Sequence, residues 1–187
     1  MAADADSTPL LILITGVMAS GKSTVAQAIA DRLERSVHLR GDVFRKMIVN
    51  GREEMTPRPT EAARAQLLLR YRLAADAAAS YLAAGFSVVY QDVILGDDLR
   101  RVASCLPHSP LHIVVLCPTA EAVASRAGER RKPGYGTFAV AELDTVLRTQ
   151  TPRLGLWLDS SDMSAEQTAD AILQRLDDAL VTKSRNI

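Results

Sequence analysis

The residues best suited to chemistry lie near the N-terminus, in the segment Gly16-Val-Met-Ala-Ser-Gly-Lys22-Ser23. This segment matches the pattern G-x-x-x-x-G-K-[ST], which is typical of a loop that cradles phosphate groups. Its glycines let backbone N–H groups point at phosphate oxygens, and the helix that follows adds partial positive charge. We expect Lys22 to reach the β- and γ-phosphates of ATP and Ser23 to ligate Mg²⁺. The predicted cofactor contacts in this region are Gly16, Ala19, Ser20, Gly21, Lys22, Ser23 and Thr24.

Other residues separate the classes of protein that use such a loop. Guanine-reading proteins carry Asn-Lys-x-Asp, which is absent, because neither Asn50 nor Asn186 begins that pattern. Motors and AAA-type machines usually need a larger module and an Asp-Glu pair at the end of a core strand. The third apolar run here ends in Tyr90-Gln-Asp-Val93, without that pair. The sequence therefore favours a small phosphotransferase over a GTPase switch or an ATP-driven machine.

A carboxylate follows the second apolar run, in Arg40-Gly-Asp42. At the carboxyl end of a strand it would face the γ-phosphate from the acceptor side. There it can accept the hydrogen bond of a hydroxyl group and orient that hydroxyl for in-line attack. Asp42 is therefore a predicted catalytic and substrate-binding residue, with Arg45 one helical turn along as a further substrate contact. The alternative is that Asp42 caps the short helix that follows, and the two roles can coexist.

A second carboxylate, Asp92, follows the third apolar run. It is predicted either to hold Mg²⁺ through water, as strand-end aspartates do in many enzymes of this kind, or to hydrogen-bond the substrate. The alternative is a strand-end residue in an ordinary turn.

Basic residues gather in the stretch that contains Arg126, Arg130, Arg131 and Lys132. Guanidinium groups match the negative charge of a phosphoryl group during transfer, and a loop that closes over ATP would exclude water. The sequence predicts a lid over about residues 126–138, with Arg130 as a catalytic residue and Arg126 as a cofactor contact. A solvated basic loop is the alternative for Arg131 and Lys132.

Further candidates for acceptor binding are Arg58 in the polar loop over residues 50–59, and Gln66 and Arg70 in the long helix after it. Gln66 and Arg70 are spaced i,i+4 and therefore share one helix face. For each of the three, a solvated surface position is the alternative interpretation.

Apolar runs alternate with helical patterns along the whole chain, which predicts parallel strands joined by helical crossovers. The predicted strands are 10–15, 37–40, 86–90, 111–116 and 156–158; the predicted helices are 23–34, 43–49, 60–84, 97–104, 119–126, 140–149 and 164–180, the last starting at a capping box. The expected fold is one α/β domain over residues 1–187, with a doubly wound five-stranded parallel sheet covered by helices on both faces. Such sheets bind ligands beyond the carboxyl ends of their strands, where the phosphate loop, Asp42 and Asp92 fall.

The composition is that of an ordinary globular protein, with 48% hydrophobic and 24% charged residues in a chain of 187. The 22 basic and 22 acidic residues balance, which argues against a nucleic-acid partner. Cys105 and Cys117 have no metal-ligand spacing and are expected to be free thiols. The N-terminus lacks the positive start of a signal peptide, and the apolar run Leu10–Ile14 is too short to cross a bilayer. We expect a cytoplasmic monomer or homodimer without a membrane partner.

These motifs, in this order, resemble those of small P-loop kinases. The segments that carry the resemblance are Gly16–Ser23, Arg40–Arg45, Gln91–Val93 and Arg126–Arg130. They are most similar to the chloramphenicol phosphotransferase-like group, with shikimate, gluconate and adenylylsulfate kinases as wider relatives. The resemblance implies a five-stranded parallel sheet, a lid, ATP with Mg²⁺, and transfer of the γ-phosphoryl group to a hydroxyl of a small molecule.

The resemblance also implies roles for single residues. Asp42 would be the acceptor-side base, Arg126 would lie over the adenine, Arg130 would be a lid arginine, and Gly155–Asp162 would form the adenine-side loop. The stretch Arg52–Arg72 matches no acceptor-recognition pattern, so an antibiotic such as chloramphenicol and a metabolite both stay open as acceptors.

Two other functions are compatible with the sequence. One is a nucleotide or polynucleotide kinase, whose phosphate-reading pocket would use Arg58, Arg64 and Arg70. The other is a non-catalytic ATP-binding protein with a role in resistance or regulation, because a phosphate loop indicates binding more strongly than chemistry.

Overall fold

The structure is a computed structural model and describes residues 8–56, 58–107, 110–128 and 140–181. Most of the predicted lid falls outside these ranges, and so do Arg130, Arg131 and Lys132. The described part of the lid stretch, residues 126–128, forms the end of a helix.

Five parallel strands form the centre of the molecule, in the spatial order β2-β3-β1-β4-β5. Their bounds are β1 (Leu11–Gly16), β2 (Ser36–Arg40), β3 (Ser87–Gln91), β4 (Leu111–Leu116) and β5 (Leu156–Leu158). Every residue of β1 and β4 is buried, which explains why both strands are almost uninterrupted apolar runs in the sequence. The predicted doubly wound parallel sheet is confirmed.

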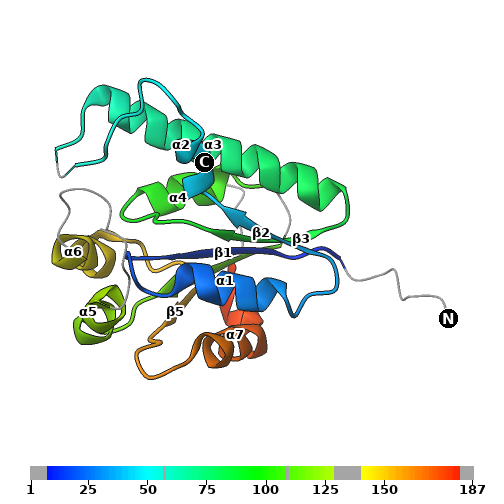
Figure 1. The fold of residues 1–187 in the computed structure, drawn as a ribbon. Coiled ribbons are helices and arrows are strands. Elements are labelled where there is room, and N and C mark those ends of the chain that lie inside the picture. The colour runs from blue at the N-terminus through cyan, green and yellow to red at the C-terminus, as the bar shows by residue number, and fades with distance from the viewer. Residues whose placement is uncertain (1–7, 57, 108–109, 129–139, 182–187) are drawn as a thin grey trace.

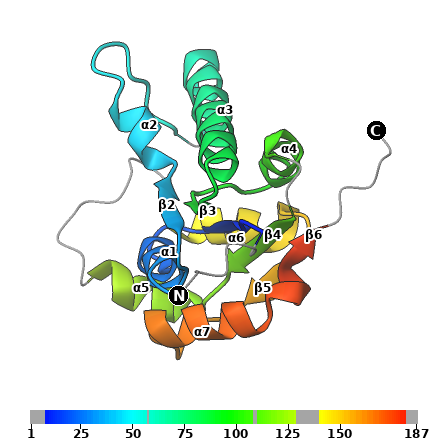
Figure 2. The same ribbon diagram turned by 90° about the vertical axis from the view of Figure 1, so that its right-hand side faces the viewer.

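Helices cover both faces of this sheet (Figure 1). On one face lie α1 (Lys22–Ala30) and α7 (Ala165–Gln174), and on the other lie α3 (Glu61–Ala83) and α4 (Asp98–Cys105). The short α2 (Asp42–Lys46) packs beside α3 (Figure 2), and α5 (Ala120–Gly128) and α6 (Val140–Gln150) lie toward the carboxyl ends of the strands. None of the described helices combines the length and the apolar character that crossing a bilayer requires.

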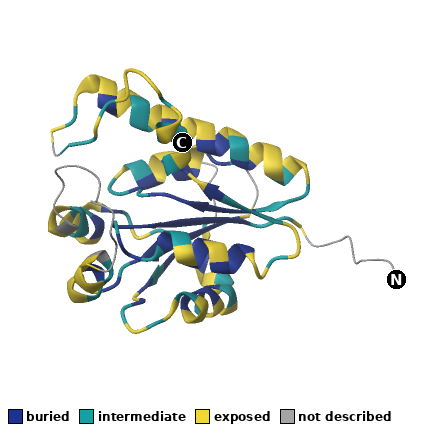
Figure 3. Cartoon of the chain, viewed as in Figure 1, coloured by how far each residue is buried: buried dark blue, intermediate teal, exposed yellow. Residues whose placement is uncertain are grey.

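The core consists of two apolar layers, one on each face of the sheet (Figure 3). Alternate residues of β1 point to opposite layers: Leu11 and Leu13 pack with α3 and α4, whereas Ile12 and Ile14 pack with α1 and α7. This alternation follows from the period of two along a strand. A central strand covered on both faces therefore fixes its own register, and with it the position of the loop that follows.

Helix starts follow their sequence signals more closely than helix ends do. The predicted capping box is present, with reciprocal hydrogen bonds between Ser164 and Gln167. The hydroxyl of Thr60 accepts the N–H of Ala63 at 3.0 Å and caps α3. In contrast, α1 ends at Ala30 rather than near residue 34, because its last turn tightens into i→i−3 hydrogen bonds.

The C-terminal part differs from the predicted helix over 164–180, which is wrong beyond Gln174. After α7 the chain forms a 3₁₀ turn, η1 (Leu176–Ala179), and a short strand, β6 (Leu180–Val181), which pairs antiparallel with the start of β4. The apolar spacing of this segment continues that of a helix, so the sequence favours one. The start of β4 extends beyond β5, and β6 satisfies backbone groups there that would otherwise lack a partner.

Two strand histidines have lowered pKa values. Burial lowers the pKa of His112 on β4, and the nearby carbonyl of Leu11, 3.4 Å from its Nδ1, only partly opposes this. Burial and then the charge of Arg40 lower the pKa of His38 on β2, whose Nδ1 lies 3.0 Å from Gln27 Oε1. Both imidazoles therefore resist protonation in the folded protein.

We predict that the protein loses stability as the pH falls from about 7.5 to about 5.5. The unfolded histidines titrate near pH ~6.5, and the folded ones do so at lower pH, so the unfolded chain binds more protons in this window. The stabilisation is complete above about pH 6.5 and declines as the pH falls toward the folded pKa values. Thermal unfolding of wild type and of a His38→Gln, His112→Gln double variant measures this. An equal loss of Tm in both proteins would contradict the assignment.

Candidate nucleotide and phosphoryl-transfer site

The loop after β1 has the backbone geometry of an anion-binding nest. Ala19 has a φ of 61° and Gly21 a φ of 96°, both in the left-handed region, whereas Ser20 between them has a negative φ. Such alternation turns successive N–H groups toward the same side of the chain, where an anion can bind. A non-glycine residue such as Ala19 in this region is uncommon and concentrates at functional sites. The loop leads directly into α1, so its concave side also faces the positive end of that helix.

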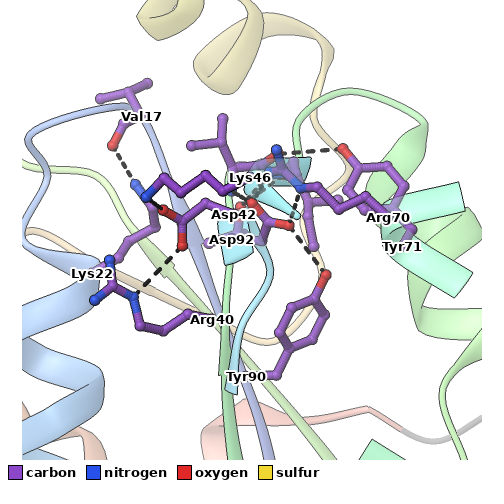
Figure 4. Close-up of polar contacts among 12 residues, drawn as sticks. Val17, Lys22, Arg40, Asp42, Lys46, Arg70, Tyr71, Tyr90 and Asp92 are labelled. Carbon is purple, nitrogen blue, oxygen red and sulfur yellow. Dashed lines mark hydrogen bonds and ion pairs between the residues drawn. The ribbon is translucent and has the colours of Figure 1, made fainter. Parts of the chain in front are cut away.

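Lys22 opens α1 and is 7% exposed. Its Nζ donates to Val17 O at 2.6 Å and to Ser20 Oγ at 3.4 Å, so the ammonium group lies over the loop (Figure 4). This position brings the cation to the side on which the loop would hold phosphates.

Ser23 follows in the first turn of α1 and is half-buried, and its hydroxyl has no hydrogen-bond partner among the described residues. Within the described ranges, no cluster of three or more His, Cys, Asp or Glu side chains could hold a metal ion. A Mg²⁺ ion here would therefore take Ser23 together with phosphate and water oxygens. This is the ligand set that Mg²⁺ prefers at nucleotide sites, so the residues present fit it.

A cavity of about 430 Å³ opens beside the phosphate loop, between α1, the end of α5 and the loop before α7. Arg126 crosses it, because its Nη2 donates to Ser160 O at 2.6 Å and to Ser161 O at 3.2 Å. Thr24 and Thr168 also line the cavity. The space has the size of a small-ligand pocket and lies where the predicted adenine-side loop meets the predicted adenine contact.

The carboxyl ends of β1, β3 and β2 meet at one edge of the sheet through backbone hydrogen bonds. Asp92 N donates to Ile14 O at 3.2 Å, and Gly41 N donates to Gln91 O at 3.1 Å. This register brings Asp92 next to the phosphate loop and places Asp42 one strand further out. Two of the predicted site residues, far apart in the sequence, are thus joined to the loop by the sheet itself.

Asp42 is the first residue of α2, whose N-cap is Gly41, and its carboxylate accepts a hydrogen bond from Lys46, so the helix-capping alternative is not supported. Its carboxylate, 19% exposed, lies between Lys46, which it contacts through Oδ2, and Arg40, whose Nε is 3.6 Å from Oδ1 (Figure 4). Oδ1 is buried and accepts no hydrogen bond from the described residues. Burial works to raise the pKa of Asp42, but the hydrogen bond and charge of Lys46 outweigh it, and the pKa is lowered. The group is an anion with one unused acceptor oxygen.

Asp92 and Arg70 form a buried ion pair beneath Asp42, with side chains 2% and 10% exposed. Arg70 Nε donates to Asp92 Oδ2 at 2.7 Å, and Arg70 Nη2 contacts Oδ1 (Figure 4). Val93 N donates to Oδ1 at 2.7 Å, and the Tyr90 hydroxyl donates to Oδ2 at 3.3 Å. Burial lowers the pKa of Arg70, but the adjacent carboxylate outweighs this effect and raises it overall. Each oxygen of Asp92 thus accepts two hydrogen bonds, so either predicted role for Asp92 would require Arg70 to release it.

The other predicted acceptor contacts surround a second, much smaller cavity between α2, α3 and loop 51–56. Arg45, Gln66 and Arg70 line it, together with Met55 and Leu67. Its volume is about 10 Å³, the lower limit for a single water molecule, so the loop leaves no room for a larger ligand in this conformation.

Gln66 fastens this loop to α3. Its Oε1 accepts Glu53 N at 2.9 Å and its Nε2 donates to Gly51 O at 2.7 Å. Arg45 Nη2 holds the loop from α2, 2.5 Å from Glu54 Oε1. Arg58 is exposed and lies outside the cavity lining.

Lys46, Tyr90 and Glu54 contact the predicted site residues without having been predicted themselves. Lys46 carries the spacing signal of an i,i+4 pair with Asp42 and could have been found. Tyr90 and Glu54 carry no such signal, because their contacts depend on how β3 and loop 51–56 meet α3 and α2.

Fold and loop together define a P-loop nucleotide-binding protein. Residues 11–153 match the model of a family described as an AAA domain. The chain therefore belongs to the AAA domain family. A curated relative, the UPF0200 protein of Aeropyrum pernix, is 37% identical over 139 residues, which make up 72% of each protein. The Asp-Glu pair, whose absence argued in the sequence against motors and AAA-type machines, is also missing at the end of β3, and the chain belongs to this family without it.

Solved structures share this fold over nearly its whole length. A sugar kinase from Janibacter sp. HTCC2649 is 22% identical, with a TM-score of 0.72 over 91% of this chain and 96% of that one. A gluconokinase from Sinorhizobium meliloti 1021 is 22% identical, with a TM-score of 0.60 over 92% of this chain and 94% of that one. The likeness shows that this chain has the fold of P-loop kinases.

We predict that Gly41→Ala destabilises the protein by about 1–3 kcal/mol, because a Cβ at Gly41 would collide with the buried carboxylate of Asp92. Urea unfolding measures the change. Gly128→Ala is the control, since a Cβ there meets nothing within 4 Å, and we expect it to leave stability unchanged or slightly higher. A Gly41→Ala protein as stable as wild type would show that Asp92 does not pack against Gly41.

Proposed function

We propose that the protein is an ATP- and Mg²⁺-dependent phosphotransferase that moves the γ-phosphoryl group to a hydroxyl of a small molecule. The observation that carries this proposal is the buried Oδ1 of Asp42, an anionic oxygen without a hydrogen-bond partner among the described residues. Buried polar atoms nearly always have a hydrogen-bond partner, so this oxygen, which has only the ion-pair contact with Arg40 Nε at 3.6 Å, suits a ligand donor. A hydroxyl group supplies that donor.

The residues proposed for phosphoryl transfer form two groups, one that would bind the nucleotide and one that would bind the acceptor. On the nucleotide side, the loop N–H groups and Lys22 would neutralise the β- and γ-phosphates, and Arg126 would face the base. On the acceptor side, Asp42 would accept the hydroxyl's hydrogen bond and aim its oxygen at the γ-phosphorus. The lowered pKa of Asp42 makes it a weak base, so its main contribution is orientation. Mg²⁺, held by Ser23, would supply charge neutralisation at the phosphates.

Acceptor binding requires loop 51–56 to move, because the cavity beneath it is closed. The bonds from Gln66 and Arg45 that hold the loop are few, and the Arg45–Glu54 pair is partly exposed. Exposed pairs contribute little, about 0–1 kcal/mol, so a bound acceptor can offset their loss. Arg130 and the rest of the proposed lid would then add charge over the transferred group.

The comparisons support this class of function through the fold. The structures named above include a sugar kinase and a gluconokinase. The resemblance of the sequence motifs to the chloramphenicol phosphotransferase-like group adds antibiotics to the acceptors worth testing. A non-catalytic ATP-binding protein is the alternative outcome.

We predict that Asp42→Asn lowers kcat by about 10²–10⁴-fold while the dissociation constant of ATP changes little, because the amide keeps the shape of the carboxylate but loses its charge. Steady-state kinetics with the acceptor that gives the highest turnover, together with calorimetric ATP titration, measure both quantities.

Asp170→Asn is the matched control. Asp170 lies on α7, away from the ends of the strands that carry the site, and its Oδ1 is 2.7 Å from Arg32 Nε. The variant should keep wild-type kinetics. Full turnover in Asp42→Asn would refute the role given to Asp42, and Lys22-dependent ATP binding without any phosphorylated product would favour the non-catalytic alternative.

A further inference from the structure

Two cations lie beside the carboxylate of Asp42, and each is nearest to a different oxygen (Figure 4). Lys46 Nζ donates a hydrogen bond to Oδ2, whereas Arg40 Nε is 3.6 Å from Oδ1 and forms an ion pair with it but no hydrogen bond. The two oxygens are therefore not equivalent: Oδ2 is bound, and Oδ1 still lacks a hydrogen-bond donor among the described residues.

The contact between Lys46 and Asp42 is confined to one turn of α2. Asp42 is the first residue of this helix and Lys46 the last, and residues spaced i,i+4 lie on one helix face. The start of the helix is fixed to the sheet, because Gly41 N donates to Gln91 O at 3.1 Å. Movement of loop 51–56, which acceptor binding requires, can therefore leave the pair intact.

The pair contributes little to stability, since Lys46 is 55% exposed and exposed ion pairs are weak in water. Its stronger effect is on the orientation of the carboxylate. The torsion between Cβ and Cγ of an aspartate is broad, so an unbound carboxylate rotates readily and presents either oxygen to a ligand. With Lys46 on Oδ2, such a rotation breaks a charge-assisted hydrogen bond, and Oδ1 stays the oxygen that is free to accept another.

We propose that Lys46 is a positioning residue for phosphoryl transfer: it binds Oδ2 of Asp42 and so keeps Oδ1 as the oxygen that receives the hydrogen bond of the acceptor's hydroxyl. This inference rests on the proposed function, to which it adds a residue that does not touch the reacting atoms. Because in-line attack depends on the direction of the hydroxyl, a carboxylate that turns freely aims that hydroxyl less well. Loss of Lys46 thus lowers turnover through Asp42 and leaves nucleotide binding unchanged.

Lys46 also affects the proton affinity of the carboxylate. Burial works to raise the pKa of Asp42, and the hydrogen bond and charge of Lys46 lower it, with smaller contributions from Arg40 and Arg70. Apart from Lys46, the charged or titratable side chains around Asp42 are Arg40 and His38 on β2, Arg70 on α3 and Asp92 after β3. Removal of Lys46 leaves burial less opposed, so the pKa of Asp42 rises and less of the carboxylate is ionised at the acid end of the pH profile.

The first test measures turnover with Mg-ATP and the acceptor that gives the highest rate. Lys46→Met keeps an unbranched aliphatic side chain and removes the ammonium group, and Lys46→Arg restores a cation. We expect Lys46→Met to lower kcat about 10–100-fold with the KM for ATP unchanged, and to move the acid limb of kcat/KM to higher pH; Lys46→Arg should recover most of both. Arg175→Met is the matched control, since Arg175 is 50% exposed and pairs with Asp178 at 2.9 Å, and it should behave as wild type.

The same kinetics in the Asp42→Asn background separate this role from one that is independent of Asp42. Because Lys46 acts through Asp42, adding Lys46→Met to Asp42→Asn should lower kcat further by no more than about twofold. Wild-type kinetics in Lys46→Met would overturn the inference, as would a full second loss in the double variant.

The second test needs no turnover. The ¹³C resonance of the Asp42 carboxyl group, assigned by its absence in Asp42→Asn, is followed against pH in wild type, Lys46→Met and Lys46→Arg. We expect its titration midpoint to be higher in Lys46→Met than in the other two proteins. Equal midpoints in wild type and Lys46→Met would show that Lys46 does not bind the carboxylate and would overturn the inference. A raised midpoint in Lys46→Met, with no compound phosphorylated by wild type, would instead refute the proposed function, and this role with it, while the contact itself stands.

Discussion

The ion pair between Arg70 and Asp92 is the interaction on which the arrangement of the site depends. It ties α3 to the end of β3, and the same carboxylate packs against Gly41, where β2 turns into α2. Because the pair is buried, replacing either partner alone leaves a charge without compensation. The position of Asp42 therefore depends on the contact between Asp92 and Gly41, the residue that precedes it.

The phosphate loop is positioned by a different kind of constraint. The strand before it is buried on both faces, so a shift by one residue would exchange its two sets of apolar side chains between the layers of the core. The register of β1 thus fixes the position of Gly16, at which the strand ends, and the position at which α1 begins. The candidate nucleotide site follows this central strand, whereas the proposed acceptor side is covered by loop 51–56, which Gln66 holds through two hydrogen bonds.

Much of this could be predicted from the sequence because the signals are local. The phosphate loop has a motif, buried strands have apolar runs, and Thr60 and Ser164 mark helix starts through their own side chains. The sequence also placed Asp42 and Asp92 at strand ends, and the structure brings both to one edge of the sheet. The pairing of Asp92 with Arg70 was not predictable, because 22 residues separate them and only the packing of α3 on β3 brings them together. The same holds for β6, whose strand conformation depends on the free edge of β4 and not on its own spacing.

The most direct test of the account follows the phosphoryl group itself. Mg-ATP is incubated with the protein and a panel of hydroxyl compounds, namely sugars, nucleosides and antibiotics including chloramphenicol, and ³¹P NMR records the products, with Lys22→Ala as control. A phosphotransferase of this kind gives a new phosphomonoester resonance that grows in step with ADP in wild type and is absent in the variant. ATP that stays intact, or that yields only inorganic phosphate with every compound despite demonstrated binding, would contradict the proposed function.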